Sequence, residues 1–190
     1  MMELQVQKGV GARALRFAIL TAARSGEVRE ARWQEIDLAG ATWTIPAERM
    51  KAGREHRVPL SEQALAVLSE ISAARISNDP AALVFPGQTH GRTLSDMSMA
   101  AVLRRMERGD LTVHGFRSTF KDWAAESTAY PAELSEMALA HTIGSKVEAA
   151  YRRGDLFEKR RRLMADWCNF CSMPLATKTS NVVILRDPKL

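Results

Sequence analysis

The chain has 190 residues, of which 46% are hydrophobic and 26% are charged, and its net charge is +5. This length and balance fit one globular domain with a sizeable core, and they exclude a disordered chain. No apolar run is long enough to span a bilayer and no signal peptide begins the chain, so we expect a cytoplasmic protein with no membrane contact.

Apolar residues recur with the period of an α-helix along most of the chain. Strand patterns interrupt this period at residues 41–46 and 54–60, which predicts a hairpin, and a brief extended piece follows at 83–85. The expected fold class is therefore α+β, mainly α-helical with a small antiparallel sheet. The predicted helices cover residues 12–22, 25–33, 61–78, 95–108, 114–126, 131–141, 146–152 and 155–171.

The C-terminal end divides into two parts. Residues 1–172 form one predicted domain, and residues 173–190 form a tail that is polar except for a strand-like VVIL at 182–185. Cys168 and Cys171 make a lone CxxC without further zinc ligands at suitable spacing. We interpret both cysteines as helix residues in a reducing compartment and expect no metal site.

Arginine carries most of the positive charge, because the chain has 20 Arg and 7 Lys. A guanidinium group can bind two phosphate oxygens at once, which an ammonium group cannot. A GC-rich genome would produce the same bias. The charge therefore permits nucleic-acid binding without establishing it.

The motif HGFR lies on a predicted helix, where His114 and Arg117 are about 60° apart around the axis. Phe116, Phe120 and Trp123 cluster on the other side of that helix. We expect the aromatic side chains to enter the core and the His–Arg pair to face outward as one unit. A solvated polar face is the ordinary alternative for such a motif.

Two further cations stand at the ends of predicted elements. Arg24 lies between two helices, and Glu27, three residues on, could hold its guanidinium group. Lys51 lies at the hairpin tip, from which a long side chain can reach a ligand. Its basic neighbours could instead lie along a nucleic-acid backbone; they are Arg49, Arg54, His56 and Arg57.

The last candidates are one histidine and the two tyrosines. His141 falls on the apolar stripe of its helix, where a core histidine with a backbone partner is an alternative. Tyr151 follows small apolar residues and precedes Arg152 and Arg153. Tyr130 stands at a predicted helix start without a basic neighbour, so we predict a structural role for it.

The order and spacing of these motifs resemble the catalytic domain of tyrosine recombinases, the phage-type integrases, and most of all the branch found in phage satellites and genomic islands. The resemblance covers residues 12–171. It rests on TAARSGE and RWQEID in 21–37, the hairpin lysine, HGFR, LAH at 139–141 and the tyrosine ten residues later. The stretch TVHGFRSTFKDWAAE is the most specific part. One departure is Ala140, where many relatives have Gly.

The resemblance implies the fold of the DNA breaking–rejoining enzymes and a chemistry that needs no metal, cofactor or ATP. Tyr151 would attack the scissile phosphate and form a 3′-phosphotyrosyl link. The other implied catalytic residues are Arg24 and Arg117 on the non-bridging oxygens, Lys51 as general acid, His114 in proton transfer from the phenol, His141 as a donor to the phosphate, and Glu27 in support. We also expect DNA contacts from Arg49, Arg54, Arg57, Arg152 and Arg153.

The implied partner is double-stranded DNA, on which the family forms a tetrameric synapse in the bacterial cytoplasm, acting on the chromosome or a mobile element. A helical core-binding domain, and often an arm-binding domain, precede the catalytic domain in the family, and the residues before Ala12 hold neither. We therefore expect weak, strongly salt-dependent DNA binding. Three alternatives remain open: a non-catalytic DNA-binding or assembly module of the same fold, a type IB topoisomerase-like enzyme, and an unrelated helical protein with chance matches.

Overall fold

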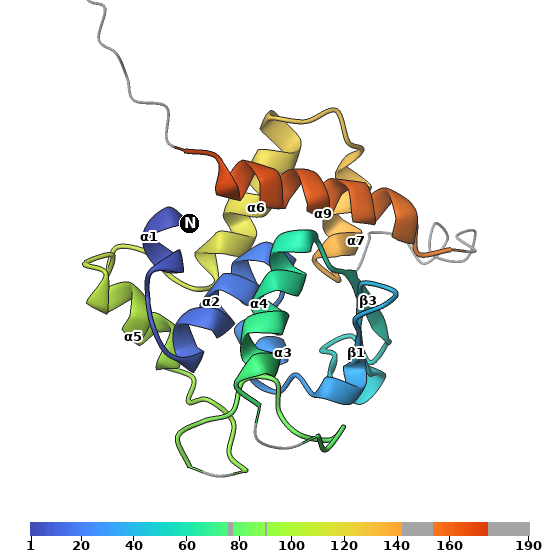
Figure 1. Ribbon diagram of the computed structural model, residues 1–190. Helices are drawn as coiled ribbons and strands as arrows, with labels where there is room; N and C mark the ends of the chain where they lie inside the picture. The colour runs from blue at the N-terminus through green and yellow to red at the C-terminus, as the bar shows by residue number, and fades with distance from the viewer. Residues whose placement is uncertain (76–77, 90, 142–153, 175–190) are drawn as a thin grey trace, which may run out of the picture.

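The computed structural model describes residues 1–75, 78–89, 91–141 and 154–174. This part is mainly helical with a small antiparallel sheet, which confirms the predicted fold class (Figure 1). The elements are α1 (Met2–Gln5), α2 (Val10–Thr21), α3 (Ser25–Arg29), the 3₁₀ turn η1 (Trp33–Glu35), β1 (Ile36–Asp37), β2 (Thr42–Ile45), the 3₁₀ turn η2 (Ala47–Arg49), β3 (His56–Pro59), α4 (Glu62–Ala73), α5 (Ser98–Arg105), α6 (Gly115–Glu126), α7 (Ala132–Ala138) and α9 (Phe157–Ser172).

Helix α2 lies at the centre of the core. Its sequence VGARALRFAILT is mostly apolar, and it packs against α4, α5 and α9. Phe17 of this helix is fully buried against Trp43 and Phe85, with ring centroids 5.3 and 5.4 Å apart. Tilted aromatic pairs bury a large apolar area in a defined geometry. The position of the C-terminal end of α2, at Ala22, is therefore set by the core.

The sheet has the strand order β1-β2-β3, and both strand pairs are antiparallel. Trp43 pairs with Val58 in register, and both residues are buried. The long loop between β2 and β3 carries Lys51, in agreement with the predicted hairpin. The sequence pattern misses β1, because two residues are too few to show an alternation.

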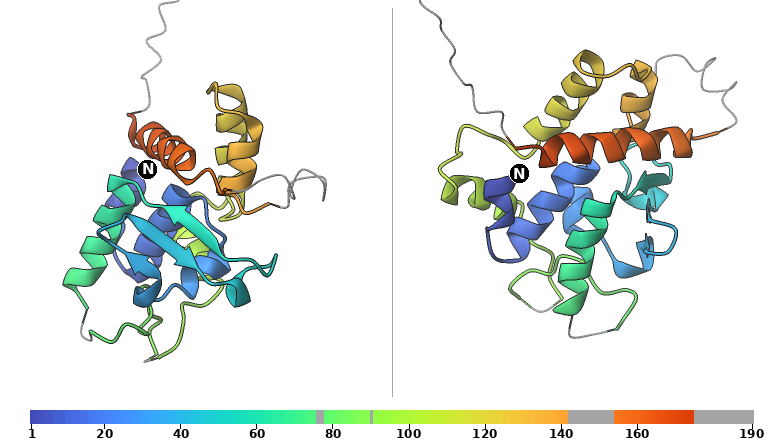
Figure 2. Two further views of the ribbon diagram at one scale, coloured as in Figure 1. Left: turned by 90° about the vertical axis from the view of Figure 1, so that its right-hand side faces the viewer. Right: turned by 45° about the horizontal axis from the view of Figure 1, so that its top comes forward.

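Helices α6, α7 and α9 lie together on one side of the molecule, and α2, α4 and the sheet lie on the other (Figure 2). The rings of Phe120 and Trp123 join α6 to Trp167 of α9, with centroids 5.4 and 5.2 Å apart. The Trp167 Nε1–H donates to the carbonyl of Ile19 at 2.8 Å, which joins α9 to α2. The predicted placement of Phe120 and Trp123 in the core is confirmed, and Phe116 packs against the core only partly buried.

Four predicted helices are longer than the observed α3, α4, α5 and α7. Helix α3 ends at Arg29 because the backbone that follows pairs with another segment: the Trp33 N–H donates to the Ala82 carbonyl at 3.1 Å. The predicted helix at 146–152 and the strand at 182–185 lie outside the described residues. Among the helices of the described part, none combines the length and apolar character that crossing a bilayer requires.

Candidate active site

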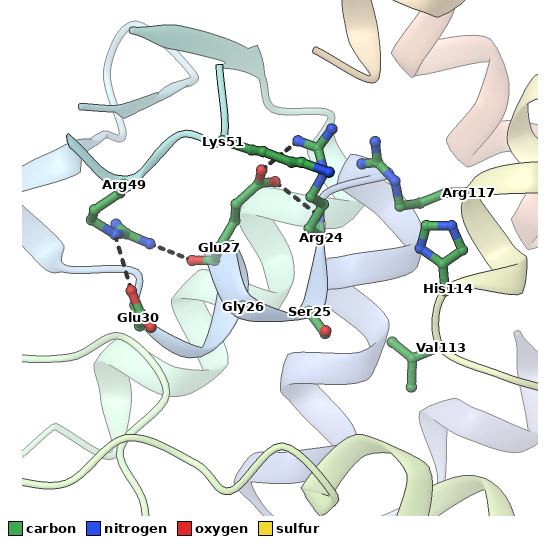
Figure 3. Close-up of a pocket in the computed structure, with 10 residues that line it drawn as sticks. All are labelled: Arg24, Ser25, Gly26, Glu27, Glu30, Arg49, Lys51, Val113, His114 and Arg117. Carbon is green, nitrogen blue, oxygen red and sulfur yellow. Dashed lines mark hydrogen bonds and ion pairs between the residues drawn. The ribbon is translucent and has the colours of Figure 1, made fainter. Parts of the chain in front are cut away.

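A cavity of about 380 Å³ opens where three separate segments of the chain meet. These segments are the start of α3, the loop between β2 and β3, and the start of α6 (Figure 3). Six of the predicted site residues line it, and no two of the three segments are adjacent in sequence. The lining consists of Arg24, Ser25, Gly26, Glu27, Glu30, Arg49, Lys51, Val113, His114 and Arg117.

Arg24 is held by a carboxylate from its own helix. It is the residue before α3, and Glu27 is the third residue of that helix. The Glu27 carboxylate accepts the Arg24 backbone N–H at 2.8 Å and the Nη1–H of the guanidinium at 2.7 Å. A carboxylate at this position caps the free N–H groups of a helix start. Glu27 is buried, so the ion pair predicted from the spacing is well defined.

Arg117 enters the cavity from α6 but is buried, with 4% of its surface exposed. Its Nη1–H donates to the carbonyl of Ala22, and its Nη2–H donates to the carbonyl of Leu139 at 2.8 Å. Ala22 and Leu139 are the residues that close α2 and α7. The guanidinium group therefore joins the C-terminal ends of two helices, where the helix dipole favours a cation.

The burial of Arg117 corrects the prediction that it faces outward with His114. The angle between two residues on a helix does not say which face meets a neighbour, and Arg117 shares the buried side of α6 with Phe120, three residues on. Burial, and next the nearby positive charge of Arg24, lower the pKa of Arg117 to about 10, and the negative charge of Glu27 partly offsets them. Arg117 is still a cation at neutral pH.

Lys51 is exposed on the loop between β2 and β3, and its side chain extends toward Arg24 (Figure 3). Two residues earlier, Arg49 fastens this loop to the protein. Its Nη1–H pairs with the buried carboxylate of Glu35, and its Nη2–H donates to the Glu27 carbonyl at 2.5 Å. Its Nε lies 3.8 Å from a carboxylate oxygen of Glu30.

The hairpin is less basic than the sequence predicts. Arg49 uses its guanidinium group inside the protein and keeps 13% of its side chain exposed, whereas Arg54 and Arg57 are exposed. Arg57 stacks on the ring of Phe157 at 4.0 Å. Burial, and next the charge of a neighbouring arginine, lower the pKa of His56 to about 4, so this predicted basic residue is neutral.

His56 contacts the same helix end as Arg117. Its Nε2 lies 3.3 Å from the carbonyl of Ala138, the residue before the Leu139 carbonyl that accepts from Arg117. A carbonyl only accepts, so the neutral ring carries its proton on Nε2. The last turn of α7 is thereby tied to strand β3 and to α6.

His114 is the residue before α6, and it is exposed at the edge of the cavity. Figure 3 shows its ring beside the Arg117 side chain. It contributes a donor or acceptor from the side opposite to Lys51.

His141 follows the end of α7, and 38% of its side chain is exposed. Its Nδ1 lies 2.6 Å from Oε2 of Glu136, and its Nε2 lies 3.5 Å from Nη2 of Arg117. The alternative of a core histidine with a backbone partner is therefore wrong. Ala140 has a φ of 50°, in the left-handed region that glycine adopts without strain. Glu136 was not among the predicted residues, because its contact forms only through this turn.

The candidate nucleophile Tyr151 and the neighbouring Arg152 and Arg153 lie outside the described residues. The other tyrosine, Tyr130, donates its hydroxyl proton to Asp166 Oδ2 at 2.7 Å. This hydrogen bond is the main cause that raises the pKa of Tyr130, so a phenolate is disfavoured there. The contact supports the structural role predicted for Tyr130.

The two cysteines are free thiols on α9, of which Cys168 is buried in the core and Cys171 is partly buried. Burial raises the pKa of Cys168 to about 11 and that of Cys171 to about 12, which keeps both protonated and unreactive. Within residues 1–75, 78–89, 91–141 and 154–174, no cluster of three or more His, Cys, Asp or Glu could hold a metal ion.

The cavity is lined by the cations Arg24, Arg49, Lys51 and Arg117 and by two carboxylates, those of Glu27 and Glu30. Such a set binds a tetrahedral anion with several oxygens, and phosphate is the natural choice. Convergent cations also stabilise charge that grows on phosphate oxygens during phosphoryl transfer.

Comparison with known proteins gives one family and several relatives. The model described as "Phage integrase family" matches residues 4–156. "Prophage integrase IntA" of Escherichia coli strain K12 is 37% identical over 176 residues, which covers 92% of this chain and 41% of that protein. "Integrase" of Enterobacteria phage P4 is 31% identical over 193 residues, which covers 93% of this chain and 43% of that protein. The chain thus spans about two fifths of the length of these relatives.

Proposed function

Because the chain belongs to the phage integrase family, we propose that it breaks and rejoins DNA strands in site-specific recombination, through a covalent bond to Tyr151. The observation that supports this most is the convergence of Arg24, Arg117, Lys51 and His114 on one cavity. The role of Tyr151 rests on the resemblance and on its spacing ten residues after His141.

In the proposed step, the phenolic oxygen of Tyr151 attacks the phosphorus, and the bond from phosphorus to the 5′-oxygen breaks. Lys51 gives a proton to the leaving oxygen, and His114 takes the proton of the phenol. The energy of the broken bond is kept in the phosphotyrosyl link, so the reverse attack by a 5′-hydroxyl rejoins a strand without ATP. A phenol has a pKa of about 10 and is mostly protonated at neutral pH, so surrounding positive charge assists the attack by favouring loss of its proton.

Arg24 and Arg117 hold the two non-bridging oxygens, where negative charge grows in the transition state. A preorganised donor of this kind typically contributes about 10²–10³ in rate. Arg117 is the stronger candidate, because its partners within the protein are neutral carbonyls and its charge is left for the ligand.

The proposed substrate is double-stranded DNA, with residues 1–172 as the catalytic domain and with several copies assembled on the DNA. Arg54 and Arg57 are exposed and would contact the DNA backbone. Backbone contacts of this kind make binding fall steeply with salt.

The test uses a pool of nicked duplexes of randomised sequence at low salt. Cleavage next to the nick releases a short fragment, so the covalent complex cannot rejoin and accumulates. We expect a protein–DNA adduct that peptide mapping places on Tyr151, and its loss in Tyr151→Phe with DNA binding retained. Tyr130→Phe is the matched control and should keep the adduct. An adduct on another residue would overturn the assignment.

The same experiment separates the alternatives. Salt-dependent binding without any adduct would instead identify a DNA-binding or assembly module of the same fold. Relaxation of supercoiled plasmid without exchange between two DNA molecules would identify a topoisomerase-like activity.

A further inference from the structure

We propose that Glu136 is the positioning residue for His141, and that Lys121 holds Glu136 in place. The proposal rests on the proposed function, in which His141 donates a hydrogen bond to the phosphate. Its basis is a closed set of contacts between α6 and the end of α7 that includes Arg117.

The backbone at His141 is fixed by the way α7 ends. The Ala140 N–H donates to the Met137 carbonyl at 3.1 Å, and the His141 N–H donates to the Glu136 carbonyl at 2.9 Å. Together with the positive φ of Ala140, this is the Schellman motif, which closes a helix through one left-handed residue. The chain therefore turns back at Ala140, and His141 lies against the residue that starts the motif, Glu136.

The side chain of His141 is fixed by the carboxylate of the same residue. Nδ1 lies 2.6 Å from Oε2 of Glu136, and because a carboxylate ion only accepts, Nδ1 carries a proton. The partner of one ring nitrogen decides the tautomer of the neutral ring. Nε2 is then left on the side of Arg117, 3.5 Å from its Nη2. Because a guanidinium group only donates, Nε2 of the neutral ring accepts from Arg117, and only a ring with a second proton could donate from Nε2 to a ligand.

Glu136 is itself held from α6. The Nζ of Lys121 lies 2.6 Å from Oε1 of Glu136, so the two oxygens of this carboxylate serve different partners. Lys121 stands one turn after Arg117 on α6. The hydrogen bond from Lys121 is the main cause that lowers the pKa of Glu136, so the carboxylate stays ionised. Arg117 thus contacts His141, His141 contacts Glu136, and Glu136 contacts Lys121. Helix α6 carries both Lys121 and Arg117, which closes the set.

An ordinary surface ion pair contributes little to stability, and this one is half exposed. Removal of Glu136 should therefore leave the fold intact. Its effect should appear at His141, in the position of the ring proton and in the cleavage rate.

The first measurement needs no DNA. Long-range ¹H–¹⁵N NMR of the 190-residue chain, at a pH where the ring is neutral, shows which nitrogen of each histidine carries the proton, and His141→Gln assigns the signal. We expect the Nδ1–H form for His141 in the wild type and mainly the Nε2–H form in Glu136→Ala. Glu133→Ala, one turn earlier on α7, is the matched control and should leave the Nδ1–H form. An unchanged tautomer in Glu136→Ala would overturn the proposal.

The second measurement is adduct formation on the pool of nicked duplexes. Loss of a residue that orients a reactive histidine typically costs about 10–100-fold, which is the slowing expected for Glu136→Ala. His141→Ala should slow the reaction about 100-fold, as the loss of a direct donor does. The double variant should be no slower than His141→Ala, because Glu136 acts through His141.

Multiplied effects in the double variant would overturn the positioning role. If His141→Ala cleaves normally, the catalytic role proposed for His141 fails, and the NMR result still decides whether Glu136 sets its tautomer. The two failures are therefore distinguishable.

Discussion

Two of the three arginines that line the cavity, Arg24 and Arg117, are held in opposite ways. Arg24 has a carboxylate partner three residues away, and Arg117 has two carbonyl partners from distant parts of the chain. A carboxylate cancels the charge of its partner, whereas a carbonyl satisfies an N–H group and leaves the charge in place. Of these two arginines, Arg117 is therefore the one whose charge no hydrogen-bonded carboxylate offsets.

The Arg117 side has a further property that the Arg24 side lacks. The acceptors of Arg117 are carbonyls at the ends of α2 and α7, and the neighbouring Ala138 carbonyl accepts a hydrogen bond from His56. Helix ends carry partial negative charge, which offsets part of the desolvation of the buried cation. A variant on one side of the cavity can therefore be compared with a variant on the other side.

The largest effect is expected for Arg117→Ala, which removes both the charge and the link between α2 and α7. Adduct formation on nicked DNA should slow by about 10³-fold or more, the upper range for a transition-state donor. Arg117→Lys should recover little, because one ammonium group cannot reach two carbonyls as a guanidinium fork does.

Arg24→Ala provides the comparison and should slow the reaction about 10²-fold, since its charge is already shared with Glu27. All three variants should be measured below their own melting temperatures, recorded by circular dichroism. A loss of less than tenfold for Arg117→Ala would contradict the assignment of the uncompensated charge to it.

The next effect concerns the stability of the Arg117 side at low pH. The pKa of His56 is about 4 in the folded protein and about 6.5 in the unfolded chain. Between these two pH values the unfolded chain therefore binds a proton that the folded protein does not. Stability should therefore fall as the pH drops from about 6.5 to about 4, by roughly 2–3 kcal/mol from this residue. His56→Gln cannot titrate, and its urea unfolding curves should lose that part of the pH dependence. An unchanged slope would mean that His56 is charged in the folded protein.

The sequence predicts the Arg24 side well because its contacts are local. Glu27 is three residues from Arg24, and that spacing at a helix start brings the two groups together. Lys51 is likewise placed by a hairpin that alternation and turn residues reveal. The family assigned from these motifs is confirmed by the match over residues 4–156.

The Arg117 side could not be predicted to the same degree, because its partners are far away in the sequence. Arg117 donates to the Ala22 carbonyl, 95 residues away, and its burial depends on how α6 packs against α7 and meets the end of α2. Arg49 shows the same limit of the sequence. Its partners Glu35 and Glu27 come from other elements, so the sequence pattern predicts a free cation on the hairpin. Periodicity identifies which residues share a face and cannot say what that face meets.

A smaller effect is expected on the Arg24 side. Glu27→Gln keeps the shape of the side chain and an acceptor for the Arg24 N–H, but it loses the charge that holds the guanidinium group. Adduct formation should slow about 10–30-fold, as expected for lost orientation of a catalytic group, without weaker DNA binding. Glu30→Gln removes the same charge from the exposed rim, 3.8 Å from Arg49, and should change the rate less than about threefold. Equal effects of the two variants would mean that net charge, and not the geometry of Arg24, is what matters.

The smallest expected effect is a change in stability at the helix end that supports Arg117. Ala140 has a φ of 50° and lies next to Leu139, whose carbonyl accepts from Arg117. A left-handed residue other than Gly costs about 1–2 kcal/mol, and the greater freedom of Gly in the unfolded chain offsets about half of this, so Ala140→Gly should stabilise by about 0.5–1 kcal/mol. Ala138→Gly, two residues earlier within α7, should instead destabilise by at least about 0.5–1 kcal/mol. Urea unfolding measures both, and if the two variants change stability in the same direction, the strain does not reside in the turn that carries His141 to the cavity.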